Sequence, residues 1–410
     1  MNSEKELNLS YKIIKDCEVC GSKELIPVLD FGLQPLCDDL HKIGLNPKIY
    51  RHPQEILYCM ICKTAHQKYQ IPKEVLFKEN YHYRASLTKD VVDGMKDFVA
   101  EVLKISPAAS GSTVLDIGCN DGSLLKIFAK SGFFTVGIDP TDAIIGQEQN
   151  IHHPIKGYFD SLNTKFLKDK YDTFDYITLT NVFAHIENLD ELCSNLKTLI
   201  GPKTILAIEN HYLGSVVSKN QFDTFYHEHP RTYSIKSFEF IARKLGMSIK
   251  SVSKPSRYGG NIRVILSRDD EIPDASSHTD EEFIKDGLEK MQKTFKVWTK
   301  DTRDQIMQLC SSGPILGKSL PGRAVMLINS LGLSEKEMPY IFEKPKSPKI
   351  GNLVPNTKIQ ILSDDDLLQY NYENIVIWSW HIQNEIYSYL REIGFKNKIW
   401  TVLPSFQLLD

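Results

Sequence analysis

Apolar runs and helical patterns alternate through the middle of the chain. TVLDIG from Thr113, FTVGID ending at Asp139 and DYITLTN ending at Asn181 have the composition of buried strands, and SLLKIFAKSG between the first two predicts an amphipathic helix. KTILAIEN, MSIKSVS and NIRVILS predict three further strands, the last two preceded by the helical pattern SIKSFEFIARKLG, and a short strand near Pro154 to Lys156 is the seventh. Strands that alternate with helices predict an open, mostly parallel α/β sheet.

A second α/β layer is expected at the C-terminal end. A helical pattern with an acidic start runs from about Thr279 to Cys310 and links the two layers. RAVMLIN from Arg323, KIQIL and NIVIWSW predict strands, and HIQNEIYSYLREIG predicts a helix. The length of 410 residues agrees with two or three domains of this kind.

Four cysteines near the N-terminus have the spacing of a zinc ribbon. Cys17 and Cys20 form one C-x-x-C pair, and Cys59 and Cys62 form a second pair 38 residues later. Each pair can place two thiolates on one turn, so that two pairs complete a tetrahedral site with no open position. A chance pair or a redox motif is the alternative for a single C-x-x-C. The two pairs together predict a structural Zn²⁺ site, and the other four cysteines are expected to be ordinary thiols.

Composition and charge exclude several classes of protein. Lys plus Arg number 49 and Asp plus Glu 52, for a net charge of -3, so the basic excess of a nucleic-acid-binding protein is missing. The charged N-terminal segment lacks the apolar core of a secretory signal, and no segment approaches the ~18 apolar residues of a membrane span. We expect a cytoplasmic protein with no nucleic-acid or membrane partner.

Polar residues follow the predicted central strands where a ligand of such a sheet binds. The first strand ends in D-I-G-C-N-D-G, and Asp139 ends the second about 20 residues later, where a carboxylate can accept hydrogen bonds from ribose hydroxyls. The run is not G-x-G-x-x-G, and Asp121 would repel a pyrophosphate, so S-adenosylmethionine fits better than a dinucleotide. A glycine turn that only joins strand to helix is the alternative. Glu209 to His211 should also line the cleft, and the predicted cofactor-binding residues are Asp116, Gly118, Asn120, Asp121, Gly122, Asp139, Asn181 and His185.

The densest group of ionisable side chains lies in FDTFYHEHPRTY, which starts at Phe222. In a strand, His227 and His229 would share one face and Glu228 would point away, which leaves too few ligands for a metal. An imidazole can instead act as a general base near neutral pH, oriented by a neighbouring carboxylate. Transfer of a methyl group to carbon needs such a base, and the Tyr226 hydroxyl could stabilise the enolate oxygen. A solvated polar loop is the alternative.

Taken together, these motifs resemble the sugar C-methyltransferases that act on nucleotide-linked keto-deoxysugars, including that of tetronitrose biosynthesis. The resemblance covers the four-cysteine segment, LDFGLQPLC, VLDIG-x-NDG, GIDP, NV-x-AH, FDTFYHEH and GGNIR, in this order and nearly end to end. It implies a zinc-binding domain over residues 1–75, a class I S-adenosylmethionine methyltransferase domain over 76–275, and a C-terminal Rossmann-like domain over 276–410 that helps to bind the nucleotide sugar.

The resemblance also implies roles for individual residues. His229 is the expected general base, Glu228, Tyr226 and His227 belong to the same catalytic group, and Tyr81 or Tyr83 reaches the sugar. The sequence departs from the family pattern at Gly317 to Asn329, at Pro355-Asn-Thr357 and at His381, all in the expected substrate domain. The alternatives at this point are an O- or N-methyltransferase, another enzyme that modifies a sugar-like substrate, or a non-catalytic zinc- and S-adenosylmethionine-binding module. The chain can be a monomer or a homodimer.

Overall fold

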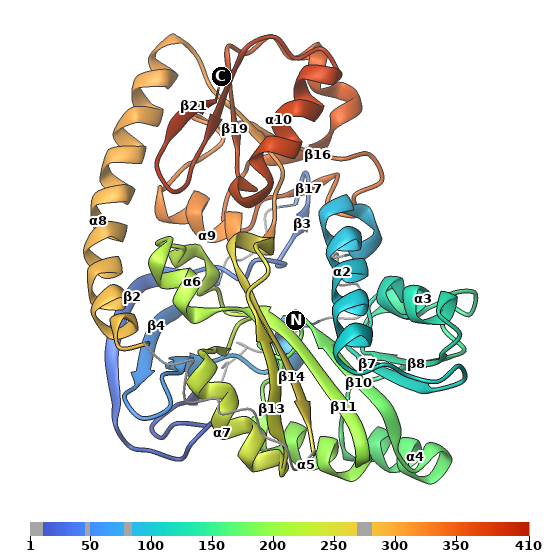
Figure 1. The fold of residues 1–410 in the computed structure, drawn as a ribbon. Coiled ribbons are helices and arrows are strands. Elements are labelled where there is room, and N and C mark those ends of the chain that lie inside the picture. The colour runs from blue at the N-terminus through green and yellow to red at the C-terminus, as the bar shows by residue number, and fades with distance from the viewer. Residues whose placement is uncertain (1–10, 46–49, 78–83, 269–280, 410) are drawn as a thin grey trace, which may run out of the picture.

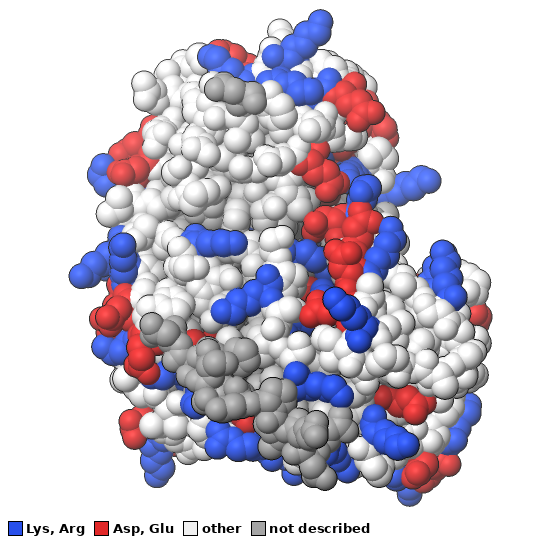
Figure 2. All heavy atoms as spheres, viewed as in Figure 1, with Lys and Arg blue, Asp and Glu red and all other residues white. Residues whose placement is uncertain are grey.

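The computed structural model describes residues 11–45, 50–77, 84–268 and 281–409 (Figure 1). Tyr81 and Tyr83, the two tyrosines expected to reach a sugar, lie outside these described residues. None of the helices among the described residues is long and apolar enough to cross a membrane. On the face drawn in Figure 2, basic and acidic side chains are interspersed in small groups between larger uncharged areas.

The central sheet contains all seven predicted strands. They are β7 (Thr113–Ile117), β8 (Phe134–Asp139), β9 (His153–Lys156), β10 (Phe174–Thr180), β11 (Ile200–His211), β13 (Ser248–Ser253) and β14 (Asn261–Ser267). Their order across the sheet is β13-β14-β11-β10-β7-β8-β9, and β14 alone runs antiparallel to its two neighbours. The prediction of a mostly parallel sheet is therefore confirmed, and the order reverses beside β7, the first strand.

Helices cover both faces of this sheet. The helices are α2 (Lys89–Ile105), α3 (Ser123–Lys130), α4 (Ser161–Tyr171), α5 (Leu189–Leu199) and α7 (Ile235–Leu245), whereas α6 (Leu213–Ser218) packs against α8 (Phe283–Leu309). Apolar side chains of α2 and α3 form one core with the strands, and those of α4, α5 and α7 form a second core. The sequence also sets where α7 begins and ends: Ser234 and Ser237 make a reciprocal capping box, and Gly246 follows the last turn at φ 67°.

The N-terminal unit is built around a four-stranded antiparallel sheet. Its strands are β2 (Leu25–Gln34), β4 (His52–Cys59), β5 (Ala65–Gln67) and β12 (Arg231–Thr232), in the order β12-β5-β4-β2. Two short strands, β1 (Lys12–Ile13) and β6 (Tyr69–Gln70), pair beside it, and α1 (Lys73–Leu76) follows. Because β12 comes from the segment after the histidine-glutamate cluster, that cluster is attached directly to the N-terminal sheet.

The C-terminal unit is a second α/β sheet, drawn in orange and red at the top of Figure 1. After the long α8 (Phe283–Leu309) come β15 (Leu316–Lys318), α9 (Gly322–Ser330), β16 (Tyr340–Glu343), β17 (Asn352–Leu353), β18 (Gln360–Ser363), β19 (Asn374–Ile377), α10 (Gln383–Glu392), β20 (Lys398–Thr401) and β21 (Gln407–Leu409). The sheet order is β21-β20-β19-β15-β16-β18-β17-β3, in which β3 (His41–Lys42) comes from the N-terminal segment.

One predicted strand of this unit is wrong. The run RAVMLIN is part of helix α9, and the strand before it is the shorter Leu316–Lys318. Six consecutive side chains of α9, from Arg323 to Ile328, are buried, so the apolar run has no periodicity that separates a helix from a strand. Pro321 directly precedes α9, where its missing N–H costs no hydrogen bond because the first N–H groups of a helix have no intrahelical partner.

Candidate functional site

The four predicted zinc ligands come together. The sulfur atoms of Cys17, Cys20, Cys59 and Cys62 lie within 4.8 Å of one another, with 3.3 Å between Cys17 and Cys62 and 3.6 Å between Cys20 and Cys59. A tetrahedral Zn²⁺ with bonds of about 2.3 Å holds its sulfurs roughly 3.8 Å apart, so the group fits this ion. Each pair sits on a tight turn, in which the N–H of Gly21 or Lys63 donates to the carbonyl of the first cysteine at 2.8 and 3.0 Å. Four thiolates leave no open position, so the zinc is structural.

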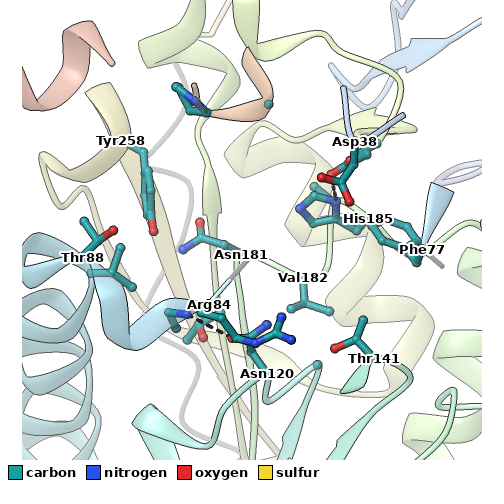
Figure 3. A pocket seen from close by; sticks show the side chains of 18 of the residues that line it. Asp38, Phe77, Arg84, Thr88, Asn120, Thr141, Asn181, Val182, His185 and Tyr258 are labelled. Carbon is teal, nitrogen blue, oxygen red and sulfur yellow. Dashed lines mark hydrogen bonds and ion pairs between the residues drawn. The ribbon is translucent and has the colours of Figure 1, made fainter. Parts of the chain in front are cut away.

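A cavity of about 820 Å³ lies between the carboxyl edge of the central sheet and the C-terminal unit. Its walls come from the ends of β7, β8, β10 and β11, from residues 37–38 of the N-terminal unit, and from the segments after β15, β16 and β19. Figure 3 shows part of this lining, with Asn120 close to Arg84 and with His185 close to Asp38. All three units of the chain therefore contribute to one cavity.

The turn after β7 has the shape required for a ligand to approach the backbone. Gly118 has φ 70°, and a Cβ at this position would lie 2.5 Å from Val182, so only glycine fits. The Asp139 carboxylate at the end of β8 accepts hydrogen bonds from the Asn120 N–H at 2.8 Å and from the Thr141 N–H at 2.8 Å. Burial raises the pKa of Asp116 to about 7, and the Thr178 hydroxyl donates to this carboxyl at 2.7 Å. A glycine cradle beside a buried carboxylate suits the amino acid and ribose parts of S-adenosylmethionine.

Two of the predicted cofactor-binding residues shape this turn from outside the cavity lining. Asp121 accepts hydrogen bonds from the Ser86 N–H at 2.9 Å and from the Ser123 hydroxyl at 2.6 Å, and thereby connects the turn to η1 (Ala85–Leu87) and α3. Gly122 is the N-cap of α3 at φ 71°. The other six predicted cofactor-binding residues line the cavity: Asp116, Gly118, Asn120, Asp139, Asn181 and His185.

The histidine-glutamate cluster forms a turn, so the expected strand geometry is wrong. The N–H of His229 donates to the carbonyl of Tyr226 at 2.9 Å, which reverses the chain direction between them. As a result Tyr226, Glu228 and His229 line the cavity together. His227 lies outside the lining, where its Nε2 donates to the Pro53 carbonyl at 3.3 Å. A turn places side chains by its own geometry rather than by the two-residue alternation of a strand, and this is why His227 and His229 do not share a face.

His229 has the surroundings of a neutral imidazole. Its Nδ1 is 2.8 Å from the Thr224 carbonyl, which can only accept, so Nδ1 carries the hydrogen and Nε2 keeps a lone pair. The rings of Tyr226, His185 and His211 lie against it, with centroids 4.3, 4.7 and 5.2 Å away. Burial, with smaller contributions from His185 and Arg323, holds the pKa of His229 well below its usual value. A side chain in this state can accept a proton at neutral pH.

The carboxylate of Glu228 has a partner that sequence reasoning missed. The Cys37 thiol, which we expected to be an ordinary residue, donates to Glu228 Oε1 at 2.7 Å, and His185 Nδ1 lies 3.9 Å from Oε2. Burial, followed by the charge of Glu228, raises the pKa of Cys37 well above its usual value, so the thiol keeps its proton. The only signal in the sequence was that Cys37 ends the LDFGLQPLC run.

The C-terminal wall contributes two lysines whose ammonium groups bind other groups of the protein. The ammonium group of Lys318, buried beneath the wall, is 2.9 Å from the Asp364 carboxylate. The ammonium group of Lys349 donates to the Leu320 carbonyl at 2.5 Å. Glu209, inside β11, binds the guanidinium of Arg263 at 2.6 Å and lies outside the cavity lining, whereas His211, the last residue of β11, lines the cavity as predicted.

Three family models match the chain in the order of its three units. A zinc binding domain model matches residues 17–77, a methyltransferase domain model matches 87–252, and a C-methyltransferase C-terminal domain model matches 256–404.

The chain is also similar to individual proteins. The C-methyltransferase NovU of Streptomyces niveus is 24% identical over 388 residues, which cover 91% of each chain. The mitochondrial ubiquinone biosynthesis O-methyltransferase of Bos taurus is 25% identical over 163 residues, or 35% of this chain and 43% of the relative. The structure of magnesium protoporphyrin IX methyltransferase from Synechocystis PCC 6803 with bound SAH covers 44% of this chain and 86% of that chain, at 20% identity and a TM-score of 0.35.

The resemblance drawn from the motifs is thus confirmed. The chain is a homologue of NovU and an S-adenosylmethionine-dependent C-methyltransferase, with a class I methyltransferase fold and a structural zinc site.

Proposed function

We propose that this C-methyltransferase forms a carbon-carbon bond on a nucleotide-linked keto sugar, with His229 as the general base. The observation that carries the proposal is the state of His229: its Nδ1 hydrogen is held by the Thr224 carbonyl, so that Nε2 can accept a proton. The sugar class rests on the family resemblance of the motifs. The cavity also suits this class of substrate, because it extends from the central sheet to the second α/β unit and so has room for both the methyl donor and a sugar joined to a nucleotide.

We assign the donor to the end of the cavity beside β7 and β8. S-adenosylmethionine supplies an activated methyl group when it is bound. Asp139 would accept hydrogen bonds from its ribose, and the glycine turn at Gly118 would admit its amino acid part. Asp116, Asn120, Asn181 and His185 complete the set of donor-binding residues that we propose.

The reaction needs a proton to leave the acceptor carbon. In our proposal His229 Nε2 accepts a proton from a carbon beside a ketone, and the electron pair of that C–H bond forms the new bond to the methyl carbon. The methyl carbon leaves the sulfur with its bond electrons remaining there, so S-adenosylhomocysteine is the second product. The Tyr226 hydroxyl would donate to the ketone oxygen as negative charge develops on it. Burial raises the pKa of Tyr226 well above its usual value, so this hydroxyl retains the proton that it would donate.

Glu228 would orient the neighbouring groups rather than take the proton. Its carboxylate lies between the Cys37 thiol at 2.7 Å and His185 at 3.9 Å. The contribution of Tyr81 or Tyr83 to sugar binding stays a prediction, as do the domain boundaries at residues 75 and 275 and the cytoplasmic location.

The test combines product analysis with one substitution. The purified protein is incubated with methyl-labelled S-adenosylmethionine and a panel of thymidine-, guanosine- and uridine-linked keto sugars that carry deuterium beside the ketone. We expect a methylated sugar that has lost deuterium from the methylated carbon; methyl transfer with full retention of deuterium would instead indicate an oxygen or nitrogen acceptor.

His229→Asn should then lower turnover by about 10²- to 10⁴-fold while S-adenosylhomocysteine still binds. His153→Asn is the matched control, because His153 lies on β9 outside the cavity lining and contacts Tyr171. A wild-type rate in the His229 variant would contradict the assignment of the base.

A further inference from the structure

The turn that carries His229 is held from two sides by units that are distant in sequence. On one side, the Gln67 amide of the N-terminal unit donates to the carbonyls of Phe225 at 2.8 Å and Tyr226 at 3.3 Å. On the other side, helix α9 of the C-terminal unit presents Arg323 to η3 (Phe222–Thr224), the short helix that leads into the turn. The second contact has no role in the chemistry described so far.

Arg323 directs most of its donors at one short segment. Its Nε and one terminal nitrogen bind the two carboxylate oxygens of Asp223 at 3.0 and 2.9 Å, in the bidentate geometry that suits a guanidinium. The same terminal nitrogen donates to the Thr224 hydroxyl at 2.8 Å, and the other donates to the Tyr258 carbonyl at 3.1 Å. The Trp380 indole N–H adds a further bond to Asp223 at 2.8 Å. Arg323 as a whole residue is 5% exposed, so water competes little for these bonds.

Thr224 joins this network to the proposed base. Its hydroxyl accepts from Arg323, and its carbonyl accepts from Nδ1 of His229 at 2.8 Å. The guanidinium and the imidazole therefore bind the same residue, and a shift of η3 would change the direction of the carbonyl that selects the tautomer of His229.

Apolar side chains also dock the C-terminal unit here. Helix α9 already buries Ala324, Val325, Leu327 and Ile328 in the core that it shares with β2 and η3. A buried ion pair contributes little net stability over apolar packing, because both charges lose their hydration. What the Arg323–Asp223 pair adds is a fixed geometry at η3.

We propose that Arg323 is a positioning residue, which holds η3 so that the Thr224 carbonyl keeps His229 in the tautomer with a free Nε2. Because α9 begins directly after the loop that forms the C-terminal wall, the alignment of the base depends on the unit that faces the acceptor. The inference rests on the proposed function of His229. Arg323 also places a positive charge close to the imidazole of His229, and this charge favours the neutral form of the imidazole.

The test uses the full chain and reads the tautomer directly. Protein labelled with ¹⁵N-histidine is compared as wild type, Arg323→Gln and Arg323→Lys, and the His229 signals are assigned as those lost in His229→Asn. We expect wild-type His229 to show the Nδ1–H tautomer and Arg323→Gln to show a mixture of the two tautomers. Arg323→Lys should be intermediate, since an ammonium group can reach one carboxylate oxygen but cannot bind Asp223 and Thr224 together.

Turnover is the second readout. In Arg323→Gln, methyl transfer should fall by about 10- to 100-fold, as expected for a misaligned base, whereas the affinity for S-adenosylhomocysteine should stay within about two-fold. Arg303→Gln is the matched control: Arg303 lies on α8, donates to the Gly332 carbonyl at 3.0 Å and is outside the cavity lining. It should leave the His229 tautomer unchanged.

The outcomes separate the two proposals. A folded Arg323→Gln protein whose His229 tautomer is the same as in the wild type overturns the positioning role, whatever its turnover. If the wild type methylates none of the keto sugars, the proposed function fails, and the tautomer comparison still decides the role of Arg323. If Arg323→Gln does not fold, Asp223→Asn removes the same ion pair with less change in volume and must give the same mixed tautomers.

Discussion

Removal of the structural zinc should disable methyl transfer through the turn that carries His229. The zinc ligands Cys59 and Cys62 are followed by β5, and β5 pairs with β12 just after that turn. The Gln67 N–H donates to the Pro230 carbonyl at 2.8 Å, and its amide donates to Phe225. The perturbation is a chelator added to the loaded protein at neutral pH, with the zinc content measured before and after.

The size of the effect follows from the bonds that join the zinc unit to this region. Gln67 supplies three of them: its N–H donates to Pro230 at 2.8 Å, and its amide donates to Phe225 at 2.8 Å and to Tyr226 at 3.3 Å. At about 1 kcal/mol net for each bond, their loss destabilises the ordered turn by about 3 kcal/mol, or roughly a hundredfold in the equilibrium with a displaced turn. The turn would then no longer hold His229 in place.

The assay separates the donor site from the base. S-adenosylhomocysteine binding is measured by calorimetry, and methyl transfer is measured on the same sample. We expect zinc-free protein to bind S-adenosylhomocysteine within about three-fold of the loaded protein, because Asp116, Gly118 and Asp139 belong to the central sheet and its turns. Turnover should fall at least 100-fold and return when Zn²⁺ is added. Zinc-free protein that stays folded and turns over at the original rate would refute this reasoning.

Three further predictions concern single groups. Asp139→Asn should weaken S-adenosylhomocysteine binding by about 10- to 100-fold in calorimetry, because the carboxylate accepts hydrogen bonds from the Asn120 and Thr141 N–H groups and faces the cavity. Asp142→Asn is the control: Asp142 forms a surface ion pair with Lys156, and its substitution should leave binding unchanged. His227→Gln should lower the melting temperature but leave kcat within a few-fold, since the side chain lies outside the cavity lining beside Pro53; a loss like that of His229→Asn would return it to the catalytic group. Burial lowers the pKa of His185 and His227 to about 4, so the unfolded chain takes up protons near pH 6.5 before the folded chain does. Urea unfolding should therefore show full stability above pH 6.5 and a loss of about 1.4 kcal/mol per pH unit for each such histidine below it, and a flat profile between pH 7.5 and 5.5 at constant zinc content would contradict the neutral buried state.

Local patterns in the sequence predicted the features that depend on neighbouring residues. The seven strands of the central sheet follow from short apolar runs between turns, and the zinc site follows from two C-x-x-C pairs, each of which brings its thiols together on one turn. The places of Gly118 and Asp139 in the cavity lining were predicted for the same reason, because each lies at the carboxyl end of a predicted parallel strand.

Tertiary structure decided the features that join distant parts of the chain. RAVMLIN was predicted as a strand although it forms a helix, because the six side chains from Arg323 to Ile328 are all buried and such burial removes the periodicity that a sequence pattern needs. The turn at His229 places Glu228 beside Cys37, 191 residues away, and sets η3 against Arg323, 100 residues away. Hydrogen bonds of this range depend on how three units pack, and no spacing within a segment encodes that packing. The sequence alone therefore determined which chemical groups are present and which strands carry them, whereas the packed structure determined which of those groups face the cavity and with what partners.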